Sequence, residues 1–216
     1  MGRLMIESPR RNPRGLAKQR SRELIMASAR RLFAELGYDG ATVRGIASAA
    51  GLTTGAVFAS FADKAGLFCA VVAAERDALL EVMRASEVGE RVEQRLVATF
   101  DAGLGFALRE PSLLPAAISA SWSPVLGRRV RHRSVRQPFR DLVSDILNAG
   151  IDRGEVASTT DVPLIADLLW GCFLLNLRCG AFEGWQPKQL RVRLRRQTRI
   201  VLASQTRQTP ATTETI

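Results

Sequence analysis

The chain has 216 residues, 46% of them hydrophobic, and carries a formal net charge of +10 at pH 7. That length and apolar content can bury a substantial core in one or two domains. The apolar runs stop short of a membrane span and no apolar signal core follows the basic N-terminus. These features argue against a membrane or secreted protein, and we expect a cytoplasmic protein with no membrane partner.

The N-terminal segment carries most of the positive charge. Residues 1–22 hold seven basic residues against one acid, whereas residues 23–70 hold four of each. Because prolines and glycines interrupt the segment, we expect residues 1–16 to form a basic arm that is disordered in the free protein. The arm could lie along nucleic-acid phosphates or reach into a minor groove, or it could be a solubilising tail. Both alternatives remain open.

Helical spacing of apolar residues predicts a first helix from about residue 21. Its buried stripe consists of Ile25, Ala29, Leu32 and Phe33. Gly37 and Gly40 are expected to end this helix, since glycine accepts the left-handed backbone of a helix C-terminus.

Two shorter helices are predicted next. Thr42 is the expected N-cap of the first, and Thr53 or Thr54 caps the second after a break at Gly51. Short helices joined by a tight glycine turn are typical of a helix-turn-helix, whose second helix enters a major groove. The sequence therefore predicts a DNA-binding domain over residues 17–63, with the motif at about 42–61.

Longer helices follow. They are predicted at about residues 63–85, 91–109, 138–153, 161–182 and 187–204. Prolines punctuate the stretch after the second of these helices, and a basic run at 128–136 has the composition of an exposed connection. With no alternating strand pattern, the expected fold class is all-α. A long helix joins the three-helix start to a helical domain at 64–206, and residues 207–216 form a disordered tail.

The helix at 161–182 is apolar around too much of its circumference for an ordinary surface helix. A second subunit would bury the additional face, and a purely intramolecular core is the alternative. The candidate dimer seam consists of Leu168, Leu175 and Phe182, which are spaced seven residues apart.

The segment LFAELGYDGATVRGIASAAGLTTGAVFASFADK, with the following Leu67, resembles the tetracycline-repressor (TetR) family of bacterial transcriptional regulators. The resemblance covers roughly residues 20–70. It implies a homodimeric regulator, a repressor in its usual form, that binds a palindromic operator and is released by a small-molecule effector. It also implies that the last two helices of each subunit form the dimer interface. No cofactor is expected.

The resemblance and the helix positions together select candidate DNA contacts. They are Thr42, Arg44, Thr53, Thr54, Gly55, Phe58, Ala59, Ser60 and Lys64. Thr42 and Thr53 stand at helix starts, where hydroxyls and free N–H groups favour phosphate. Lys64 matches a phosphate-contacting lysine of the family, and Phe58 replaces its usual tyrosine. Because the recognition helix lacks Arg, Lys, Asn and Gln, we expect thymine methyls and DNA shape to carry more of the specificity.

A tentative effector pocket is expected among the C-terminal helices. Its candidate lining residues are Phe100, Phe106, Trp122, Phe139, Trp170, Phe173 and Asn176. Any one of these aromatic residues is more often part of the ordinary core.

An enzyme is not expected. His132, the only histidine, lies among arginines in the basic connection, away from any catalytic arrangement. The three cysteines show no metal-ligand spacing, so no metal site is expected. Two alternatives remain: a regulator without a small ligand, and a small α-helical enzyme or ligand carrier whose three-helix start is merely structural.

Overall fold

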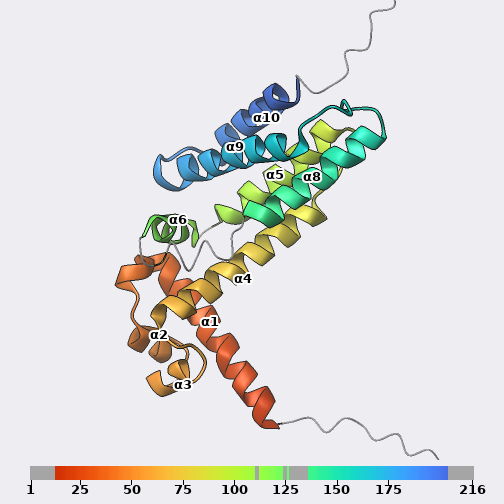
Figure 1. Cartoon of the computed structure of the whole chain (residues 1–216). Coiled ribbons are helices and arrows are strands. Elements are labelled where there is room, and N and C mark those ends of the chain that lie inside the picture. The colour runs from red at the N-terminus through yellow and green to blue at the C-terminus, as the bar shows by residue number, and fades with distance from the viewer. Residues whose placement is uncertain (1–12, 110–111, 124–125, 127–135, 204–216) are drawn as a thin grey trace, which may run out of the picture. The chain divides into compact units, whose positions relative to one another are not determined.

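The computed structural model describes residues 13–109, 112–123, 126 and 136–203, and within these ranges the protein is all-α with nine helices (Figure 1). The chain divides into two compact units, Met1–Val71 and Val72–Ile216. Helix α4 (Lys64–Ala85) begins in the first unit and continues into the second. The sequence placed a boundary near residue 63, where α4 begins.

The N-terminal unit is built from α1 (Pro13–Gly40), α2 (Val43–Ala49), α3 (Thr54–Phe58) and the first turns of α4. Gly37, with φ at 72°, interrupts α1 near its end, as its sequence context predicted. The small core includes Ile25, Ala29, Phe33, Ile46, Ala47, Val57, Leu67 and Phe68. Phe33 and Phe68 meet edge to face, with ring centroids 4.9 Å apart, and this contact ties α1 to α4.

The expectation of a disordered arm over residues 1–16 is wrong for its last four residues. Helix α1 begins at Pro13, eight residues before the predicted start. A proline is tolerated in the first turn of a helix, because its missing N–H would have no intrahelical partner there. Residues 1–12 lie outside the described part of the chain.

Within the described residues, the C-terminal unit contains the rest of α4 together with five further helices. They are α5 (Val92–Ala107), α6 (Leu114–Trp122), α8 (Arg136–Asp152), α9 (Val162–Phe182) and α10 (Pro187–Ala203). Helix α9 packs against both α8 and α10, and α10 also packs along α5. The helix predicted from residue 161 is capped by Asp161, whose Oδ1 accepts a hydrogen bond from the N–H of Leu164 at 3.0 Å.

Helix α6 was not predicted. Pro111 and Pro115 were expected to interrupt the chain, but Pro115 lies in the first turn of α6, where its fixed φ favours the helix. Of the basic connection predicted at 128–136, only Arg136 lies within the described residues, and it opens α8. The tail at 207–216 also falls outside them.

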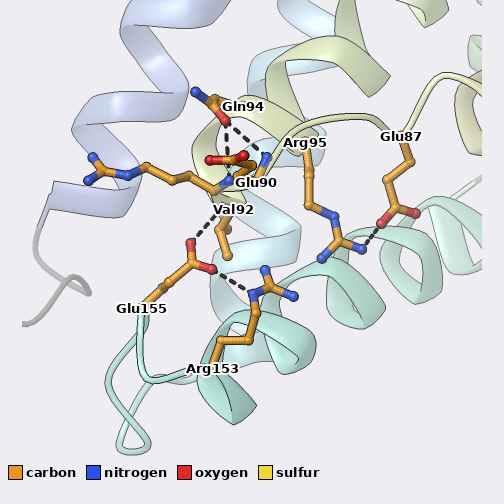
Figure 2. A network of polar contacts seen from close by, with 8 residues as sticks. Glu87, Glu90, Val92, Gln94, Arg95, Arg153 and Glu155 are labelled. Carbon is orange, nitrogen blue, oxygen red and sulfur yellow. Dashed lines mark hydrogen bonds and ion pairs between the residues drawn. The ribbon is translucent and has the colours of Figure 1, made fainter.

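A polar network anchors the start of α5 (Figure 2). Glu155, which follows α8, accepts a hydrogen bond from the N–H of Val92 at 2.9 Å and pairs with Arg153 at 2.6 Å. Burial raises the pKa of Glu155, but the hydrogen bonds from Arg153 and Val92 outweigh it, so that pKa lies below its ordinary value. Gln94 completes the cap by accepting from the N–H groups of Glu90 and Arg91.

Among the described helices, α9 is long and apolar enough to cross a membrane by length and composition alone. No such segment was expected from the sequence. One face of α9 is filled with buried core residues, including Ile165, Leu169 and Phe173. A helix that packs one face into the core of its own subunit is rich in apolar residues. This role explains why α9 has the length and composition of a membrane-spanning helix.

Candidate DNA-binding surface

Two threonine caps set the geometry of α2 and α3. The hydroxyl of Thr42 accepts a hydrogen bond from the N–H of Gly45 at 3.0 Å. The hydroxyl of Thr53 accepts from the N–H of Ala56 at 3.2 Å, so Thr53 rather than Thr54 is the cap of α3. Gly51 makes the turn between the helices with φ at 66°, a left-handed backbone that favours glycine.

The described residues of the N-terminal unit leave the outward face of α3 uncovered. Thr54, Gly55, Phe58 and Ala59 are all exposed, whereas Val57 points inward and is buried. A Cβ added at Gly55 would meet only the hydroxyl of Thr53, at an ordinary 3.7 Å. Because glycine weakens a helix and nothing inside the unit requires it here, the absence of a side chain at Gly55 favours close approach by an external partner.

Phe58 is the exposed aromatic residue of this surface, with 55% of its area accessible. It replaces the family's usual tyrosine and projects from the end of α3 into solvent. A large apolar side chain held in solvent costs free energy unless a partner covers it. Together with Ala59, it makes this end of α3 apolar.

The two basic candidates, Arg44 and Lys64, differ in their burial and in their contacts with the rest of the unit. Arg44 is exposed on α2 and makes no hydrogen bond or ion pair with any described residue, so its guanidinium can meet a phosphate. Lys64 is half-buried; its Nζ donates to the carbonyl of Asp39 at 3.3 Å and lies 4.4 Å from the ring centroid of Tyr38. These contacts orient Lys64, whose ammonium has three donors. Ser60, two residues after the end of α3, is half-buried.

Arg22 was not among the residues predicted from the sequence. It donates from α1 to the carbonyl of Ser60 at 3.0 Å and stacks over the ring of Phe61 at 4.2 Å. Through these contacts Arg22 fixes the end of the recognition helix against α1. No local pattern could reveal the contact, because its two ends are 38 residues apart in the chain.

The residues predicted to line an effector pocket separate into two groups. Phe100, Phe139 and Phe173 are fully buried and pack on one another, with centroid distances of 5.3 to 6.0 Å, and Trp170 joins them at 4.8 Å from Phe139. Phe106 is only half-buried, and the guanidinium of Arg109 stacks on its ring. Trp122 ends α6, and its side chain lies outside what the structure describes.

Asn176 is a buried polar residue of α9, three residues after Phe173. It is fully buried, and its Nδ2 donates to the carbonyl of Cys172 and to Oε1 of Gln197, both at 2.7 Å. Its Oδ1 has no partner among the described residues. An unpaired buried acceptor costs free energy, so this atom is suited to a hydrogen-bond donor on a ligand or a water molecule.

Two capped helices around a glycine turn, with an exposed row on the second helix, define a helix-turn-helix DNA-binding protein. A family model described as "Bacterial regulatory proteins, tetR family" matches residues 25–71. The HTH-type transcriptional repressor Rv1474c of Mycobacterium tuberculosis is 34% identical over 156 residues, covering 62% of this chain and 83% of that protein. This protein belongs to the tetR family and is a DNA-binding transcriptional regulator rather than an enzyme.

Other relatives match in part or in fold. The repressor AcnR of Corynebacterium glutamicum is 46% identical over 63 residues, which cover 29% of this chain and only 34% of AcnR. A TetR-family regulator from Mesorhizobium loti superposes with a TM-score of 0.71 at 22% identity, over 88% of this chain and 98% of that one. FadR of Bacillus subtilis, solved with stearoyl-CoA, gives 0.70 at 16% identity, over 84% and 97%. At these identities the structural matches establish the fold alone.

Proposed function

We propose that this protein is a homodimeric repressor that acts in the cytoplasm and binds a palindromic operator through α3 of each subunit. The observation that carries the proposal is the exposed row of Thr54, Gly55, Phe58 and Ala59, which has no role in its own unit. Repression is the activity named for Rv1474c and AcnR. In a dimer, two recognition helices would enter successive major grooves about 34–36 Å apart.

A second subunit is supported by the surface of α9. Leu168, Leu175 and Phe182 are exposed in the single chain, on a helix whose opposite face already fills the core. A contiguous apolar row of this kind on a soluble protein marks an interaction surface. The other described helices of the C-terminal unit expose few large apolar residues that could compete for this role, apart from two on α10.

Release by a small molecule completes the proposal. The aromatic residues around Phe139, with the unpaired Oδ1 of Asn176, suit a largely apolar ligand that offers one hydrogen-bond donor. FadR of B. subtilis was solved with stearoyl-CoA, which makes that compound a reasonable first probe. Such a ligand would act by favouring a dimer whose recognition helices no longer match the groove spacing.

A gel-shift experiment with the DNA upstream of the protein's own gene tests DNA binding. We expect a retarded complex that survives excess unrelated duplex and is weakened severalfold by Arg44→Ala, because one phosphate per half-site is then no longer neutralised. Equal competition by unrelated duplex would contradict a specific operator there. Release of the complex by stearoyl-CoA would identify the effector class, and persistence of the complex would exclude that compound.

A further inference from the structure

The exposed face of α9 forms one continuous row along the helix. Its members are Leu164, Leu168, Gly171, Leu175, Arg178 and Phe182, spaced by three or four residues. Arg178 is the one charged member, and it pairs with Glu183 of its own chain at 3.1 Å. The row is therefore apolar along nearly its whole length and carries no unpaired charge.

Gly171 stands at the middle of this row, and no described residue of the subunit requires a glycine there. A Cβ added there would meet nothing within 4 Å, whereas one added at Gly180 of the same helix would come within 2.9 Å of Leu108 and Leu190. Gly180 is thus required by internal packing. Since glycine is a poor helix former, an unconstrained glycine between two exposed leucines favours a close contact with a helix from outside the chain.

The charges on the two helices indicate that α9, and not α10, is the helix nearer to a two-fold axis. Helix α10 contains six basic residues and no acid. Of those exposed on it, Arg195 pairs with Asp101 at 4.0 Å and Arg199 with Glu93 at 2.6 Å, whereas Lys188, Arg191 and Arg196 make no ion pair with any described residue. In a symmetric dimer, residues beside the axis meet their own copies. An axis through α10 would bring like charges together, which is unfavourable, whereas an axis through the row of α9 would not.

We propose that the α9 helices of two copies of this chain cross at Gly171, so that the two-fold axis of the dimer passes beside this residue. Leu168 and Leu175 then pack on either side of the crossing point. Packed helices usually lie about 8–10 Å apart, and a glycine at the crossing allows the shorter end of that range or less. This inference rests on the proposed dimer and adds its geometry.

Cysteine crosslinking tests the crossing point. In a protein with Cys69, Cys172 and Cys179 replaced by alanine, Gly171→Cys should form an interchain disulfide under mild oxidation, since the two Cα atoms must lie within about 7 Å. Leu164→Cys, two turns away on the same row, is the matched control and should remain uncrosslinked. Non-reducing gel electrophoresis reads both variants, and sedimentation confirms that each is a dimer before oxidation.

The outcomes separate this inference from the proposed function. A dimer that crosslinks at position 164 rather than 171, or at neither, overturns the crossing at Gly171 and leaves the dimer intact. A cysteine-free protein that sediments as a monomer overturns both the crossing at Gly171 and the proposed dimer. Binding of that monomer to phosphatidylglycerol vesicles would show that the apolar row of α9 contacts lipid instead of a second subunit. Gly171→Leu is a second check: it should raise the dimer dissociation constant at least about 10-fold without lowering the melting temperature of the monomer. An unchanged dissociation constant contradicts the proposal.

Discussion

Gly55→Leu is the substitution that most sharply separates DNA binding from folding. A Cβ at this position meets only the hydroxyl of Thr53, at 3.7 Å, so the folded unit accepts the new side chain. Gly55 is the second residue of a five-residue helix. Replacing it should therefore change the free energy of unfolding by less than about 1 kcal/mol, in the stabilising direction.

The same leucine should obstruct the approach of α3 to DNA. Each base that the protein no longer reads costs about 1–3 kcal/mol of binding free energy. One such base in each of two half-sites then costs about 2–6 kcal/mol, which weakens operator binding by roughly 30-fold to more than 10⁴-fold.

Fluorescence anisotropy with a labelled operator duplex measures the affinity, and thermal unfolding measures the stability of the same preparation. Ala27→Leu is the control, because Ala27 is an exposed residue of α1 and the substitution adds similar bulk to the same unit. We expect both variants to unfold like the parent and only Gly55→Leu to lose operator binding. A Gly55→Leu protein that binds operator as tightly as the parent would refute the assignment of α3 as the recognition helix.

Further substitutions test the other parts of the account. Removing residues 1–12 deletes three arginines and should reduce the salt dependence of operator binding, by about 0.9 in the log–log slope for each phosphate that the arm neutralises; an unchanged slope means a solubilising tail. Phe58→Ala should weaken binding about 4-fold if its ring covers one thymine methyl, and replacing that thymine by deoxyuridine should remove the difference between the two proteins. Leu175→Arg should leave the subunit folded, because Leu175 is exposed in the single chain, but it should yield a monomer on sedimentation, because the charge would be buried in the dimer interface. Glu155→Gln should cost about 1 kcal/mol at pH 7 through the weakened bond to Val92, measured by urea unfolding. Because the pKa of Glu155 is lowered in the folded state, this difference should be present above its ordinary pKa of 4.5 and should vanish as the pH falls through the folded-state pKa.

Much of the fold was predictable because its signals are local. Asp161 and Thr53 cap their helices through hydrogen bonds to residues three positions along the chain, which is information that a short sequence window contains. Prolines were harder to interpret, since the same residue breaks a helix interior and opens a first turn. That ambiguity accounts for the missed start of α1 at Pro13 and for the missed helix α6.

The exposure of candidate site residues was predictable from the sequence, but their tertiary contacts were not. The exposure of Thr54 and Gly55 follows from helical spacing and from the family resemblance. The contacts of Arg22 with Ser60 and of Lys64 with Asp39 join residues 38 and 25 positions apart, so they depend on tertiary packing. Phe58 was selected as a candidate contact only through the family resemblance, because hydrophobicity alone predicts burial, and it is exposed.

Selection of bound duplexes from a random-sequence DNA library tests the central claim most directly. Binding by two symmetric α3 helices predicts an enriched inverted repeat, with half-site centres about 10–10.5 base pairs or a multiple of that apart. Both half-sites should be protected together when the selected duplex is footprinted with the purified protein. Enrichment of a single unrepeated half-site, or of no sequence at all, would contradict the account of a dimeric, operator-specific regulator.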